Sequence, residues 1–135
     1  MAPLPAPTAA LDRRACYALL ATAPLGRVVA TAAALPLVVP VVFALDGDDL
    51  LFPVAPGSPL AAATRGTVVA LQADAVDASR RSGWSVVVTG FADAVGDTGL
   101  VRLRPGVVTG LRLQEQGLSS DALGPQVPHL RVARH

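Results

Sequence analysis

The hydrophobic and polar positions of the chain predict a protein built mainly of β-strands. Apolar, β-branched runs alternate with short segments rich in glycine, proline and aspartate, a pattern typical of strands joined by tight turns. These runs predict six strands, at residues 25–31, 35–45, 49–55, 67–73, 83–95 and 100–113. The alternation is clearest in the fifth run, where Trp84, Val86 and Val88 share one face. Six strands joined mostly by hairpins favour closure into an antiparallel β-barrel.

Two short helices are predicted beside the strands. Thr8 is a candidate N-cap for a helix over residues 9–22, whose apolar positions recur on one face. Pro59 suits the first position of a second helix over residues 60–64, and Gly66 is the glycine expected just after it. The fold class is therefore mainly β with short helices.

Three further signals place turns and a bend along the strands. The Asp46-Gly47 pair predicts a tight hairpin, and a shorter turn is expected near residues 32–34. Gly90, inside the longest strand, predicts a bend or bulge of the kind that barrels require.

Arg27 is expected to form an ion pair on the surface or at an interface.

Composition indicates one domain and a protein partner. The 135 residues are 52% hydrophobic and only 16% charged, which is more apolar surface than one small core can cover. We therefore expect a homodimer. One folded domain is predicted at residues 10–113, with a flexible proline-rich lead-in at 1–9 and a loose tail at 114–135.

Several classes of location and partner are disfavoured. The net charge is +1 with no lysine, which argues against binding to nucleic acid. Residues 28–45 carry no charge, but Pro36 and Pro40 argue against a membrane-spanning helix there, and Pro24 argues against signal-peptide cleavage after residue 23. Cys16 is the only cysteine and is expected to be a buried core thiol. The chain is expected to be cytoplasmic.

The sequence contains no recognisable catalytic or metal-binding motif. The only histidines, His129 and His135, lie near the C-terminus, and neither a nucleophile elbow nor a phosphate-binding P-loop is present. Asp46, Asp48 and Asp49 crowd one turn, and a solvated hairpin tip explains them better than a Ca²⁺ site. If the chain is an enzyme, a cofactor supplies the chemistry.

One segment has the form of an anion-binding cradle. The predicted third strand ends at the loop Ala55-Pro56-Gly57-Ser58, and the second predicted helix begins directly after this loop. Backbone N–H groups at such a loop and helix start are free to bind a phosphate. Ser58 is the best polar candidate for such a contact, although helix capping alone would also explain it.

The order of these motifs resembles the pyridoxamine 5′-phosphate oxidase-like family of flavin-binding split barrels. The resemblance covers roughly residues 10–112. It rests on Gly-Arg-Val at 26–28, Val-Pro-Val at 39–41, Asp46-Gly47, the 55–58 loop and Arg-Ser-Gly-Trp-Ser-Val at 81–86. It implies a six-stranded split barrel that dimerises, with FMN (in some branches F420 or haem) bound in clefts at the dimer interface, and oxidoreductase activity.

The resemblance also implies a set of cofactor-binding residues. The strand carrying Val39, Val41 and Phe43 would run beside the flavin ring, and the loop carrying Val54, Gly57 and Ser58 would hold the phosphate. Trp84 and Ser85 would approach from the neighbouring subunit.

The chain departs from the family at the phosphate. Members usually have an Arg or His and then a Thr where this chain has Pro53 and Val54, and a Lys where it has Pro59. Ser58, backbone N–H groups and Arg65 remain. Three interpretations stay open. The chain is an FMN-binding oxidoreductase of unknown substrate, or a split-barrel dimer that has lost FMN and binds F420, haem, an apolar small molecule or a partner protein, or a purely structural accessory protein.

Overall fold

The fold is one curved antiparallel sheet with two short helices. The computed structural model describes residues 9–114. Its elements, in chain order, are β1 (Ala9–Ala10), α1 (Arg13–Leu20), β2 (Gly26–Ala32), β3 (Leu35–Val41), β4 (Ala44–Asp46), β5 (Asp49–Pro53), α2 (Pro59–Ala63), β6 (Thr67–Asp77), β7 (Ser82–Ala94) and β8 (Leu100–Gln114).

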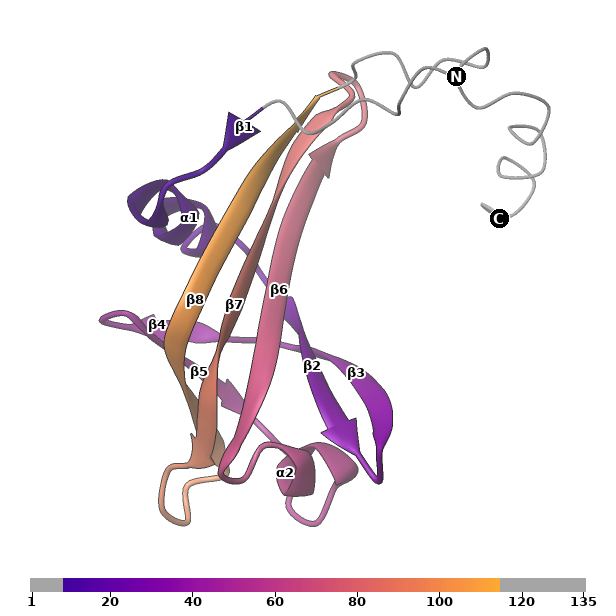
Figure 1. The fold of residues 1–135 in the computed structure, drawn as a ribbon, viewed down its shortest axis with the longest axis vertical. Helices are drawn as coiled ribbons and strands as arrows, with labels where there is room; N and C mark the ends of the chain where they lie inside the picture. The colour runs from indigo at the N-terminus through magenta and orange to yellow at the C-terminus, as the bar shows by residue number, and fades with distance from the viewer. Residues whose placement is uncertain (1–8, 115–135) are drawn as a thin grey trace, which may run out of the picture.

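The strand order curves the sheet so that its two edge strands come close together. The order is β3-β2-β6-β7-β8-β5-β4, with β1 added to β8. The two edge strands, β3 and β4, are consecutive in the chain and are joined only by Val42 and Phe43. The long strands β6, β7 and β8 form the body of the sheet, and the chain between β3 and β4 crosses it (Figure 1). The edges of the sheet are thus held close by the chain itself.

The core lies inside this curved sheet. Strands β2 and β7 bury every second residue, as the alternating pattern predicted for Trp84, Val86 and Val88. The largest fully buried side chains include Phe52, Leu50, Leu71 and Leu103. Helix α1 packs on β7 and β8, and helix α2 packs on β2.

The predicted strands are confirmed as β-structure, with two differences. The run at 35–45 is two strands, β3 and β4, because the chain turns from one edge of the sheet to the other at Val42 and Phe43. Strand β6 does not end at Ala73 but continues to Asp77, which pairs with Ser82. The Asp77 carboxylate accepts hydrogen bonds from the N–H groups of Ser79 and Arg80 at 3.1 and 3.2 Å, and so closes the β6–β7 turn.

The first helix is shorter than predicted. It spans Arg13–Leu20, and its N-cap is Asp12, whose carboxylate accepts a hydrogen bond from the N–H of Ala15 at 2.8 Å. Ala9 and Ala10 pair with β8 instead of being helical. The expected cap, Thr8, lies outside the described residues, as do the lead-in before it and residues 115–135 of the expected tail. Ala9 and Gln114, which border the predicted domain of residues 10–113, are strand residues.

Two other expectations, for Cys16 and Arg27, are confirmed. Cys16 is fully buried, and burial raises the pKa of its thiol, which disfavours a reactive thiolate. Arg27 forms an ion pair with Asp74 at 3.5 Å. In the part of the chain that the structure describes, no helix has the length and apolarity needed to cross a membrane.

The turn between β2 and β3 is built from residues that disfavour its geometry. Ala33 and Ala34 have φ angles of 51° and 64°, the left-handed pair found in tight hairpins, where Asn-Gly is preferred. Replacing both, as Ala33→Asn with Ala34→Gly, should stabilise the fold by about 1 kcal/mol because left-handed alanine is strained. Urea unfolding would measure the gain, and an unchanged or lower midpoint would contradict the strain.

Candidate functional site

The loop after β5 is held in place at both ends. The N–H of Val54 donates to the carbonyl of Gly99 at 2.9 Å, and the N–H of Ser58 donates to the carbonyl of Ala55 at 3.1 Å. Ser58 is the N-cap of α2, and its hydroxyl accepts a hydrogen bond from the N–H of Ala61 at 3.1 Å. Gly57 has a φ of 74° and open space around it. The sequence thus produces the predicted strand, glycine loop and helix start.

A cavity of about 410 Å³ lies between this loop and strand β3. We call it the cradle cavity. Strand β3 contributes Val39 and Val41 to it, and the loop with the start of α2 contributes Val54, Ser58 and Leu60. Residues from two separate stretches of the chain therefore meet in one apolar hollow.

Four of the predicted cofactor residues line the cradle cavity, namely Val39, Val41, Val54 and Ser58. Phe43 does not line it but packs half-buried against the core, because the chain has already turned toward β4. Gly57 lies on the opposite side of the loop and lines a neighbouring cavity. The role of each residue in holding a cofactor remains a prediction.

Trp84 and Ser85 lie away from the cradle cavity in their own chain. Trp84 is buried near the β6–β7 turn, where it lines a separate cavity of about 330 Å³. That turn is at the opposite end of the long strands from α2 (Figure 1). Ser85 points to the other face and accepts a hydrogen bond from the Gln72 side chain at 3.2 Å. Contact of either residue with the cradle would require a second subunit, as the resemblance implies.

The electrostatics of the cradle cavity match its composition. Each lining side chain is apolar except Ser58. Pro53, Val54 and Pro59, the three departures from the family pattern, all line it. The walls therefore fit the apolar face of a flavin ring, whereas a phosphate would find the Ser58 hydroxyl and backbone N–H groups but no cation. Among residues 9–114, no cluster of metal-ligating side chains is present either.

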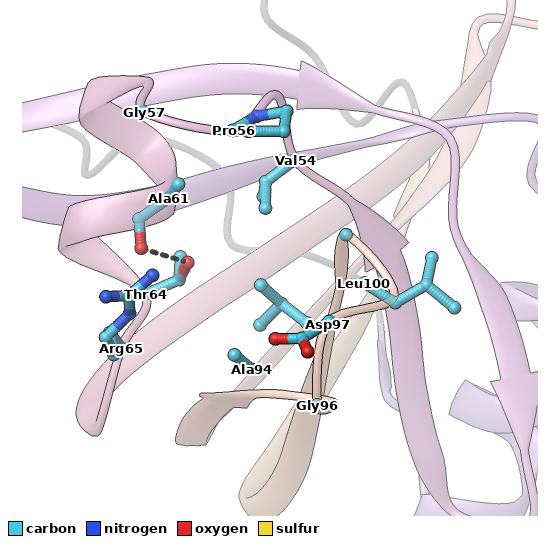
Figure 2. A pocket seen from close by; sticks show the side chains of 12 residues that line it. Val54, Pro56, Gly57, Ala61, Thr64, Arg65, Ala94, Gly96, Asp97 and Leu100 are labelled. Atoms are coloured by element: carbon cyan, nitrogen blue, oxygen red, sulfur yellow. Dashed lines mark hydrogen bonds between the residues drawn. The ribbon is translucent and has the colours of Figure 1, made fainter.

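A second cavity, of about 270 Å³, lies on the other side of the same loop. We call it the outer cavity. Pro56 and Gly57 line it, and Val54 lines both cavities. Figure 2 shows Arg65, at the end of α2, and Asp97, from the β7–β8 turn, on opposite sides of it. Arg65, the one cation that the sequence left near the loop, thus faces the outer cavity and not the cradle cavity.

The acidic β4–β5 turn is more than a solvated tip, and sequence reasoning missed its partners. Arg102 of β8 donates hydrogen bonds to the carboxylates of Asp46 and Asp49, each at 3.0 Å. These bonds, from Asp49 first and Asp46 second, raise the pKa of Arg102. The hydroxyl of Tyr17 in α1 donates to the carbonyl of Asp48 at 2.6 Å. The cluster fastens this edge hairpin to the sheet and to α1, and nothing in it points to catalysis.

The comparisons with known proteins agree with this architecture. A family model described as pyridoxamine 5′-phosphate oxidase matches residues 12–112. The uncharacterized protein Rv0080 of Mycobacterium tuberculosis is 35% identical, over 76% of this chain and 84% of its own. The chain therefore belongs to the pyridoxamine 5′-phosphate oxidase family.

Solved structures confirm the fold as the split barrel that the resemblance implied. The FAD binding protein from Mycobacterium smegmatis superposes with a TM-score of 0.73 at 34% identity, covering 78% of this chain and 98% of its own. A FAD-binding protein from Mesorhizobium loti superposes with a TM-score of 0.67 at 20% identity, covering 78% of this chain and 98% of its own. At 20% identity, the similarity to the M. loti protein shows the fold alone.

Proposed function

We propose that the protein is a flavin-binding oxidoreductase whose isoalloxazine ring lies in the cradle cavity. The observation that carries this proposal is the meeting of Val39 and Val41 of β3 with Val54 and Ser58 of the loop in one apolar cavity. The resemblance had assigned these residues to the flavin ring and phosphate independently of any structure. The M. smegmatis relative, named as a FAD binding protein, adds support for a flavin.

The residues of this chain would act by holding and orienting the flavin. The apolar walls would contact the ring surface, and Ser58 and the N–H groups of the loop would offer hydrogen bonds to a phosphate. The capping bond from the N–H of Ala61 to the Ser58 hydroxyl holds this serine in place. A bound flavin supplies hydride transfer at its ring, so the chain needs no acid or base of its own for that step. Within the described residues, no side chain is assigned a catalytic role.

A second candidate function follows from the missing cation. A cavity lined by valine, leucine and proline around one hydroxyl also suits an apolar ligand without a phosphate. The protein would then be a binding module that keeps the family fold but not its FMN. F420 and haem are the cofactor alternatives that the resemblance offers.

One titration separates these functions. The purified chain is examined by absorbance for bound flavin or haem, and then titrated with FMN, FAD, F420 and haem while ligand fluorescence or absorbance is followed. Saturable binding of FMN or FAD at micromolar concentration supports the flavin function. Absence of flavin binding together with binding of another ligand supports the binding module.

Ser58→Asp tests whether a phosphate lies at the loop. Aspartate caps helices as well as serine does, so the free energy of unfolding should change by less than about 0.5 kcal/mol. A carboxylate beside a phosphate repels it, so the affinity for FMN should fall at least about tenfold. Calorimetric titration of the variant measures the second effect and urea unfolding the first. Unchanged FMN affinity in a stable variant would place the phosphate elsewhere.

The outer face of the sheet supports the proposed homodimer. Val29 pairs with Val38 and Val68 pairs with Phe91, and the register places Val107 on the same face. All five are exposed, Val68 by 69% and Phe91 by 45%. An apolar patch of this kind fits a second copy of the chain. Sedimentation equilibrium should give twice the chain mass of 13.7 kDa, and the mass of a single chain at micromolar concentration would argue against the dimer.

A further inference from the structure

The two cavities beside the 54–58 loop are adjacent parts of one surface. The residues of the loop and of α2 line them in turn: Ser58 and Leu60 line the cradle cavity, whereas Gly57 and Ala61 line the outer cavity. Val54 lines both. The space beside Gly57 is open, since an added Cβ there would have nothing within 4 Å. A ligand longer than the cradle cavity would therefore find the outer cavity next to it, along the same loop.

Arg65 is held where it can meet such a ligand. The preceding Thr64 is fully buried, and its hydroxyl donates to the carbonyl of Leu60 at 2.7 Å. The N–H of the following Gly66 donates to the carbonyl of Ala92 at 2.9 Å, which ties the end of α2 to β7. The backbone of Arg65 is thus fixed on both sides, and its side chain lines the outer cavity (Figure 2). A guanidinium is the side chain best suited to bidentate contact with a phosphate.

Asp97 faces the same cavity from the β7–β8 turn. The turn is closed by hydrogen bonds from the N–H of Thr98 to the carbonyl of Val95 at 3.1 Å and from the N–H of Leu100 to the Thr98 hydroxyl at 3.1 Å. The side chains of Arg65 and Asp97 make no hydrogen bond or ion pair with any part of the chain that the structure describes. A carboxylate in such a place accepts hydrogen bonds from the hydroxyls of a ribose.

We propose that the outer cavity binds the adenosine-phosphate half of a flavin dinucleotide, with Arg65 on the second phosphate and Asp97 on the adenosine ribose. This rests on the proposed flavin function and specifies its ligand. The flavin half would occupy the cradle cavity, the diphosphate would pass the open space at Gly57, and the apolar side chains of Val54 and Leu100 would border the nucleoside. The chain then places its phosphate-binding cation beyond the cradle, where a mononucleotide such as FMN does not reach.

The test compares FAD and FMN on the full chain by calorimetric titration. FAD should bind at least about tenfold more tightly than FMN, because one charge-assisted phosphate contact is worth that factor or more. Arg65→Gln should lower the affinity for FAD at least about tenfold and change that for FMN less than about twofold. Asp97→Asn should weaken FAD alone and by a smaller factor. Arg14→Gln, an exposed arginine of α1 away from both cavities, is the matched control and should leave both affinities unchanged.

Each other outcome has a definite meaning. Equal affinities of the wild-type chain for FMN and FAD, or an Arg65→Gln variant that stays folded and keeps its affinity for FAD, would overturn the assignment of the outer cavity while leaving the flavin function intact. If Arg65→Gln lowers the affinities for FMN and FAD equally, Arg65 contacts the first phosphate, and the assignment of the outer cavity is overturned as well. Binding of neither flavin by the wild-type chain would overturn both proposals.

Discussion

Gly90→Ala should lower the free energy of unfolding by about 3 kcal/mol, the largest loss expected from adding a single methyl group to this fold. Gly90 is buried in β7 at the point where the pairing with β8 shifts register, so that Thr89 pairs with Val107 but Gly90 pairs with Pro105. A Cβ at Gly90 would collide with the carbonyl oxygen of Arg104, which is backbone and cannot rotate away.

Gly106→Ala is the matched control for this prediction. Gly106 lies in the same bulge, but a Cβ there would meet its nearest neighbour, the carbonyl oxygen of Thr89, at an ordinary contact distance of 3.5 Å. Its effect should stay below about 1 kcal/mol. Urea unfolding of both variants measures the difference. Similar losses for the two variants would mean that the bulge relaxes as a whole, and that the close approach at Gly90 is not what constrains it.

The second large effect concerns affinity. The double variant Val54→Thr with Pro59→Lys restores a hydroxyl and a cation to the cradle cavity, and should raise the affinity for FMN at least about tenfold. Both side chains line the cavity beside Ser58, so the new groups reach the place where the resemblance puts the phosphate. Pro59 is the first residue of α2, where lysine is tolerated because the N–H has no partner within the helix.

Ala62→Lys controls for added charge. Ala62 is exposed on the same helix and lines neither cavity, so a lysine there adds the same charge to the same element without reaching the cradle. Its affinity for FMN should stay within about twofold of the wild-type value. If the double variant gains no affinity while remaining folded, the loop does not present a phosphate site, and the binding module becomes the better account of the cavity.

The sequence predicted the parts of the fold that local chemistry determines. Strand runs, the Asp46-Gly47 turn, the start of α2 at Pro59 and the bulge at Gly90 each depend on a few neighbouring residues. The turn, the helix start and the bulge lie where expected, and the strand runs differ only in the break after β3 and the greater length of β6. The first helix was predicted too long because an apolar stripe does not show where a helix begins. Asp12 caps it, and pairing of Ala9 and Ala10 with β8 competes with helix formation before that residue.

Contacts between residues that lie far apart in the chain could not be predicted from local sequence patterns. The resemblance brought Val39 and Val41 together with Val54 and Ser58, and the structure places them around one cavity. No local pattern could show that Arg65 and Asp97, thirty-two positions apart, face each other across the outer cavity. Nor could the sequence show Arg102 reaching Asp46 and Asp49, since that contact depends on the pairing of β5 with β8.

The two edges of the sheet also determine how this protein resists aggregation. An edge strand offers unpaired N–H and C=O groups to any passing extended chain. β3 carries Pro36 and Pro40, four residues apart and so on the same side of the strand, and neither has an N–H to give. β4 is only three residues long and ends in a charged turn. A protein this rich in β-branched, apolar residues thus presents edges that a further strand cannot easily extend into a fibril.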